Sequence, residues 1–166
     1  MRYKNTADAL LPSFLSLSHS NLGDVITTTP TIGSNVEEVE HRGVHFQVWD
    51  LGGQDKLRRV WSTYYVNAHA VVLVIDSLDR ERLGLVREEL DKINSNDELR
   101  RASLLVLANK QDLDGAMGAG EIAQSLKLHA NKDASWQIMS CSATTGEGLY
   151  EGFDWLAHTL RNKRVV

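Results

Sequence analysis

The sequence has 166 residues, of which 42% are hydrophobic and 24% are charged, and this composition is typical of one compact domain with a single substantial core. Its formal net charge of -4 provides no electrostatic basis for binding nucleic acid, which depends on many lysine and arginine contacts to phosphate. No apolar run approaches the roughly 20 residues that cross a bilayer, and the single cysteine, Cys141, excludes an internal disulfide. We therefore expect a cytoplasmic protein without a transmembrane segment.

The first 20 residues differ in character from the rest of the sequence. Position 2 is Arg2 rather than glycine, so we expect no N-myristoylation site at this N-terminus. Residues 5–18, NTADALLPSFLSLS, contain no glycine and include Pro12. We predict an atypical N-terminal segment at residues 1–20 and one folded domain at residues 21–166.

The first regular pattern is a pair of alternating segments. Residues 35–40 and 44–48 alternate polar and apolar side chains, and Arg42-Gly43 between them has the composition of a turn. This pattern predicts a hairpin of two antiparallel strands.

Beyond the hairpin, short apolar runs alternate with segments of helical periodicity. The pattern predicts strands at residues 71–75, 104–108 and 136–140, and helices at residues 83–93, 119–126 and 149–160. Such alternation is typical of parallel strands joined by crossover helices. The predicted fold class is α/β, a doubly wound sheet that is mostly parallel with one antiparallel strand.

Ligands of such sheets bind beyond the carboxyl ends of the strands, where loops and helix N-termini meet. Three polar or glycine-rich loops follow predicted strands, at residues 50–54 (DLGGQ), 109–112 (NKQD) and 142–144 (SAT). We expect the chemistry of the protein to reside in these loops.

The loop NKQD has side chains suited to a purine base. The carboxylate of Asp112 can accept two hydrogen bonds from the adjacent N–H donors of guanine, a pair that adenine does not present. We expect Lys110 to pack its stem over the base plane and Asn109 to tie this loop to its neighbours. The alternative is an ordinary polar loop between a strand and a helix.

This tetrapeptide resembles the guanine-specificity motif of GTP-binding proteins, and other segments extend the resemblance. Residues 49–56, WDLGGQDK, and 30–33, PTIG, resemble the corresponding segments of the Arf branch of small GTPases, and residues 34–38, SNVEE, are similar to its fifth Arf-like subgroup. The resemblance covers about residues 28–162. It implies the fold of a P-loop GTPase, with residues 21–166 as a small GTPase (Arf-like) domain.

The resemblance implies GTP or GDP and Mg²⁺ as cofactors, and slow GTP hydrolysis as the activity. Asp50 would bind Mg²⁺ through water and Thr31 would bind it directly, while the Gly53 amide would contact the γ-phosphate and Gln54 would orient the attacking water. The residues implied in nucleotide binding are Gly53, Asn109, Lys110, Gln111, Asp112, Ser142 and Ala143.

The resemblance also implies protein partners and a cellular setting. Trp49 and Tyr64 are similar to members of an exposed surface that holds effectors, although a role in the core is an equally open interpretation. An exchange factor and a GTPase-activating protein are further expected partners. The implied role is in vesicle-mediated trafficking, with a cytoplasmic location that can be peripheral to Golgi membranes.

One motif of the family is missing. A P-loop has the spacing G-x-x-x-x-G-K-[ST], in which backbone amides and the lysine surround the phosphates, and the sequence contains no Gly-Lys dipeptide. We therefore expect the first strand and P-loop to be missing or replaced. Residues 9–17 either fill that strand or, as we favour, are a remnant of the following helix. Two alternatives to a working switch remain: a nucleotide-deficient interaction module, and an aberrant first exon.

Overall fold

The computed structural model describes residues 34–52, 55–131 and 135–163. The predictions for residues 1–33, including residues 9–17 and Thr31, and those for Gly53 and Gln54 concern residues outside this part. The α-helices and strands are β1 (Ser34–His41), β2 (Val44–Leu51), α2 (Asp55–Arg58), β3 (Ala70–Asp76), α3 (Leu83–Asn94), β4 (Ser103–Asn109), α4 (Ala119–Ser125), β5 (Trp136–Ser140) and α5 (Leu149–Lys163), and short 3-10 helices span Trp61–Tyr64, Asp97–Leu99 and Leu128–Ala130. The strands and helices predicted from residue 35 onward are thus confirmed, with bounds that differ by a few residues.

Strands β1 and β2 form the predicted antiparallel hairpin, paired along its whole length from Ser34↔Leu51 to His41↔Val44. The two turn residues, Arg42 and Gly43, have φ of 52° and 70°. Positive φ at both central residues matches the right-handed twist of the flanking strands. The turn therefore fixes the register of the hairpin.

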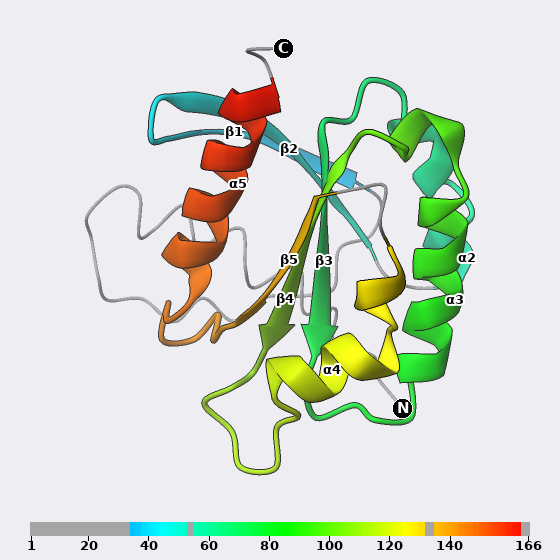
Figure 1. The fold of residues 1–166 in the computed structure, drawn as a ribbon, viewed down its shortest axis with the longest axis vertical. Coiled ribbons are helices and arrows are strands. Elements are labelled where there is room, and N and C mark those ends of the chain that lie inside the picture. Colours follow the sequence, from blue (N-terminus) through cyan, green and yellow to red (C-terminus); the bar gives the residue numbers. More distant parts are fainter. Residues whose placement is uncertain (1–33, 53–54, 132–134, 164–166) are drawn as a thin grey trace.

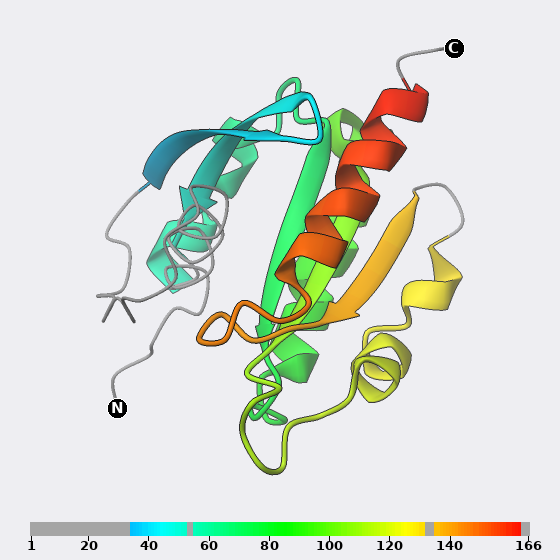
Figure 2. The same cartoon turned by 90° about the vertical axis from the view of Figure 1, so that its left-hand side faces the viewer.

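Strands β3, β4 and β5 form a parallel sheet with β4 in the centre. All seven residues of β4 are buried, which is expected for the middle strand of a parallel sheet covered on both faces. Figures 1 and 2 show α5 on one face of this sheet and α3 and α4 on the other. The molecule is thus a three-layer α/β structure.

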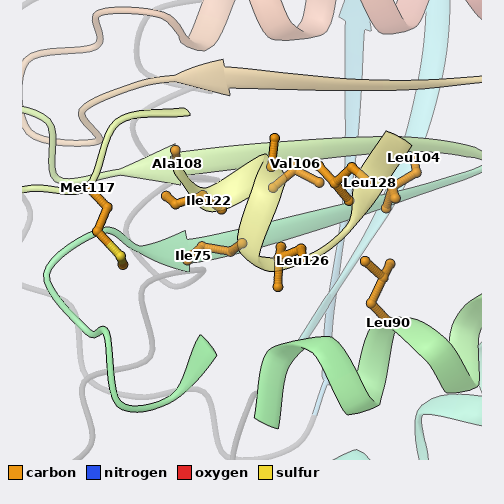
Figure 3. Close-up of a cluster of buried hydrophobic side chains, with 10 residues drawn as sticks. Ile75, Leu90, Leu104, Val106, Ala108, Met117, Ile122, Leu126 and Leu128 are labelled. Carbon is orange, nitrogen blue, oxygen red and sulfur yellow. The ribbon is translucent and has the colours of Figure 1, made fainter. Parts of the chain in front are cut away.

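Alternate residues of β4 belong to two separate cores. Leu105 and Leu107 pack with Phe153 and Leu156 of α5. The opposite face carries the larger cluster, which Figure 3 shows between the sheet and the helices α3 and α4. Its buried members are Ile75, Leu90, Leu104, Val106, Ala108, Met117, Ile122, Ala123, Leu126 and Leu128.

Among the described residues, α5 contacts both the hairpin and the parallel sheet. Within the described residues, no strand of the hairpin is hydrogen-bonded to β3, β4 or β5. Instead, Val39 of β1 belongs to the core beneath α5, and the ring of Phe46 meets that of Phe153 edge-on at 6.1 Å between centroids. Figure 2 shows the hairpin beside the parallel sheet, with α5 between the viewer and the sheet. Helix α5 therefore packs against both the hairpin and the parallel sheet.

This arrangement confirms the predicted α/β fold of parallel strands with an antiparallel addition. None of the described helices has both the length and the apolar character needed to cross a bilayer.

Candidate functional site

The carboxyl ends of the three parallel strands lie at one edge of the sheet. The register pairs Asp76 of β3 with Asn109 of β4, and Ala108 of β4 with Ser140 of β5. The loops that follow these strands are therefore neighbours in space, as the sequence predicts for residues 109–112 and 142–144.

A buried side chain joins these two loops. The side-chain oxygen Oδ1 of Asn109, which is 2% exposed, accepts a hydrogen bond of 2.8 Å from the backbone N–H of Ala143. The backbone N–H of Gln111 also donates to the carbonyl oxygen of Cys141, at 3.1 Å. The expectation that Asn109 ties its loop to a neighbour is confirmed.

Gln111 holds the loop from its other side. Its side-chain amide donates to Ser77 Oγ and to the carbonyl oxygen of Met117, both at 2.9 Å. Ser77 and Met117 are fully buried. Both hydrogens of this amide are therefore used within the protein, so its donors shape the loop rather than face a ligand.

Lys110 stands in the left-handed region, with φ of 71°, and its ammonium group forms an ion pair with the carboxylate of Asp76. Both side chains are part-buried. Sequence reasoning did not identify Asp76 as part of the site, although the residue ends a predicted strand. Its position at the carboxyl end of β3, paired with Asn109 of β4, is the feature that could have indicated a place in the site.

Asp112 differs from its neighbours because its side chain is exposed. Within the described part of the chain, its carboxylate has no hydrogen-bond or ion-pair partner. Ser142, by contrast, is buried, and its hydroxyl oxygen accepts a hydrogen bond of 3.2 Å from the backbone N–H of Thr145. The loops thus form an internally bonded frame beside which the Asp112 carboxylate is exposed and available.

Cys141 lies beneath this frame. Its side chain is 1% exposed, and burial raises the pKa of its thiol to about 12. The thiol is therefore protonated near neutral pH and has the character of a small apolar core residue.

Asp50 lies on β2, the penultimate residue of that strand, and is buried. The next loop begins with Gly52, whose carbonyl oxygen accepts a hydrogen bond of 3.2 Å from the indole nitrogen of Trp61. No group of three or more histidine, cysteine or acidic residues that would enclose a metal occurs among the described residues. One carboxylate at a strand end suits Mg²⁺, which keeps several waters and is commonly held by one or two carboxylates together with phosphate.

The predicted effector residues lie side by side on the surface. The rings of Trp49 and Tyr64 are 5.3 Å apart between centroids and inclined at 47°. Trp49 is 47% exposed, so a role in the core does not apply to it, whereas Tyr64 is half-buried. Val36, which pairs with Trp49 across the hairpin, is also exposed.

The site is an open edge of the sheet. One surface recess borders it and is lined by Asp76 and residues 78–81. A larger recess lies on the hairpin, around Arg42 and His45, and contains none of the predicted nucleotide-binding residues. Its size alone therefore does not mark it as the functional site.

Two comparisons with known proteins agree with this geometry. The model of the ADP-ribosylation factor family (Arf) matches residues 16–160. A solved structure, that of the Arl6 (BBS3) small GTPase from Trypanosoma brucei with the bound nucleotide analogue GppNp, is similar to this chain with a TM-score of 0.83 and 32% sequence identity. The match covers 95% of this chain and 93% of that one. The chain therefore belongs to the ADP-ribosylation factor family of small GTPases.

Proposed function

We propose that the protein binds guanine nucleotides as an Arf-like switch, with slow GTP hydrolysis and a role in vesicle-mediated trafficking at Golgi membranes. The observation that carries the nucleotide proposal is the available carboxylate of Asp112 beside the bonded pair Asn109 and Ala143. A carboxylate in such a frame is pre-positioned to accept two N–H bonds from guanine. The similarity to a GTPase with bound GppNp supports the same assignment.

The hydrogen bonds of this frame also indicate how guanine would bind. The Ala143 N–H, which the family resemblance assigns to the guanine carbonyl, already donates to Asn109, so the base oxygen would share that donor or displace it. Lys110 is held by Asp76 and would leave that partner if its stem packs over the base. Gln111 would act by fixing the loop, since its amide hydrogens are bonded to Ser77 and Met117.

For the phosphate end, we propose that Asp50 holds Mg²⁺ through water. When bound, Mg²⁺ would neutralise charge on the phosphate oxygens. The roles proposed for Thr31, Gly53 and Gln54 rest on the family resemblance. An arginine from a GTPase-activating protein would complete the hydrolytic site.

The absent P-loop motif sets the expected strength of binding. Charge-assisted hydrogen bonds to phosphate contribute roughly 1.5–3 kcal/mol each, and several are lost without that loop. We therefore propose that the base and the metal supply an unusually large share of the affinity. Selection for guanine should then be pronounced, because the base contacts remain.

A competition experiment tests the nucleotide proposal. A fluorescent guanine nucleotide bound in Mg²⁺ buffer should be displaced by unlabelled GTP or GDP. ATP at about a hundredfold higher concentration should not displace it, because adenine lacks the pair of N–H donors from which the Asp112 carboxylate accepts. Equal displacement by ATP would show that the protein does not select guanine.

We also propose an effector surface formed by Trp49, Tyr64 and Val36, since exposed apolar side chains that lie together are typical of binding sites. Replacement of Trp49 by alanine should weaken capture of a partner about tenfold or more, the cost typical of a central aromatic residue. The control is Leu113→Ala, which removes an exposed apolar side chain from the nucleotide loop.

The effector surface also separates the two functional candidates. If partners bind equally well with and without guanine nucleotide, the surface acts as a nucleotide-independent interaction module. If they bind only in the presence of GTP, the switch proposal holds.

A further inference from the structure

We propose that Asp154 of α5 is a positioning residue that fixes the hairpin, and with it Asp50, by a charge clasp at the hairpin turn. The clasp consists of Asp154, His41 and Arg42. The proposal goes beyond the nucleotide site described above, and its link to Mg²⁺ rests on the proposed function.

The clasp joins residues that are more than 100 positions apart in the sequence. Arg42 donates to the Asp154 carboxylate through Nε and Nη2, each at 2.9 Å, and thus binds both oxygens. His41 Nε2 lies 2.5 Å from Oδ1 of the same carboxylate. A bidentate guanidinium–carboxylate pair constrains direction as well as distance, so the clasp fixes the angle of the turn against α5.

Other groups on α5 close around the same turn. The ring of Tyr150 lies 5.9 Å from that of His41, and the guanidinium of Arg161 lies against Gly43, where an added Cβ would be 3.7 Å from it. His41 is buried, although Arg42 is exposed. The turn is therefore docked on the helix by contacts with both its buried and its exposed side.

The clasp has a particular importance because the hairpin has no backbone hydrogen bonds to the parallel sheet within the described residues. Away from the turn, the hairpin packs against α5 through the apolar side chains of Val39 and Phe46, and apolar contacts are non-directional. The strands are paired along their whole length, so a shift of the turn is transmitted along β2 toward Asp50. The clasp thus sets where that carboxylate stands.

Hydrogen exchange of the hairpin amides tests the clasp without any nucleotide. In Asp154→Asn, the amides of β1 and β2 should exchange about tenfold faster, a factor set by the loss of charge-assisted bonds that are partly exposed. The amides of β4 should be unchanged. Glu151→Gln, on the same helix and exposed, is the matched control and should behave as the unmodified protein.

Rescue separates the charge pair from a general loss of packing. The double variant Arg42→Asp with Asp154→Arg should return hairpin exchange to within about threefold of the unmodified protein, because the pair is restored with its signs reversed. Unchanged exchange in Asp154→Asn, or no recovery in the double variant, would overturn the clasp.

The pH dependence gives a second measurement. The hydrogen bonds from Arg42, reinforced by His41 and opposed by partial burial, lower the pKa of Asp154 from 3.8 to about 2. A carboxylate with a lowered folded-state pKa stabilises the fold above its ordinary pKa, and this contribution is lost as the pH falls through about 4 toward 2. The free energy of unfolding, measured with urea, should differ between the unmodified protein and Asp154→Asn by a constant amount from pH 5 to 6. This difference should shrink by pH 3. A difference independent of pH would contradict the clasp.

The link to Asp50 is tested by nucleotide affinity with and without the metal. In Mg²⁺, Asp154→Asn should raise the Kd for GTP about threefold to tenfold, and Asp154→Glu should recover most of the loss. In EDTA, the variant and the unmodified protein should bind equally, because the base loops do not belong to the hairpin. An equal loss of GTP affinity in both buffers would show that Asp154 has only a structural role. If the unmodified protein did not bind GTP at all, the proposed function would be refuted, and hydrogen exchange of the hairpin would still test the clasp.

Discussion

Replacement of Asp112 by asparagine should change the base that the protein selects from guanine to xanthine. Guanine offers two N–H donors to the Asp112 carboxylate, and an asparagine amide can match only one of them. We expect the affinity for GTP to fall about a hundredfold or more, since each charge-assisted bond contributes about 1.5–3 kcal/mol. Xanthine carries a carbonyl in place of the guanine amino group, so the asparagine N–H₂ gains a partner. Titration with fluorescent GTP and XTP measures both changes.

The control for this variant is Asp114→Asn, two residues further along the same exposed loop. It removes the same charge without touching the predicted base contact. Equal losses of GTP affinity in the two variants would show that Asp112 acts through general electrostatics, and the absence of any XTP binding by Asp112→Asn would contradict a direct contact with the base.

Gly148→Ala should be the most destabilising single-methyl change in the site. Gly148 has φ of 75°, and a Cβ there would overlap the carbonyl oxygen of Ser140 and approach its carbonyl carbon at 3.0 Å. The left-handed conformation costs an alanine about 1–2 kcal/mol, and the overlap adds a steric cost of similar size. We expect a loss of about 3 kcal/mol and a fall in Tm of about 8 °C, measured by thermal unfolding.

Gly115→Ala separates these two costs. Gly115 has φ of 82°, but an added Cβ meets nothing within 4 Å. This variant should lose only about 1 kcal/mol, the cost of the backbone conformation. If both alanine variants were equally stable, the close approach of Gly148 to the Ser140 carbonyl group at the end of β5 would be contradicted.

Local features of the sequence predicted the elements well. The Arg42-Gly43 turn and the alternating segments on either side predicted a hairpin that the structure confirms, because turn composition and a period of two are local properties. The apolar run at residues 104–108 similarly predicted the buried central strand β4. These predictions needed no knowledge of which elements contact one another.

Long-range pairing was the part that the sequence did not reveal. The ion pair of Lys110 with Asp76 and the bonds of Gln111 to Ser77 depend on the parallel register of β3 and β4, which brings residues 34 positions apart together. The partner of Arg42 is even more distant in the sequence. No periodicity indicates such contacts, because they arise from the way whole elements pack.

The phosphate side of the site remains a prediction. Thr31, Gly53 and Gln54 lie outside the described residues, so their proposed roles still rest on the resemblance of PTIG and DLGGQ to family motifs. On the base side, the structure brings together the loops that carry Asn109, Lys110, Asp112 and Ala143. Experiments on the base contacts are therefore the more direct test of function.

The most direct measurement is the equilibrium affinity of the nucleotide-stripped protein for a fluorescent GTP analogue in Mg²⁺ buffer. Our account predicts saturable binding with one site per chain, stronger for guanine than for adenine nucleotides, and a Kd above the nanomolar range because of the missing P-loop contacts. A Kd of about 1–100 µM would correspond to roughly 8–5.5 kcal/mol of binding energy, which base and metal contacts can supply. No saturable binding at about 1 mM nucleotide would contradict the proposed guanine-nucleotide switch.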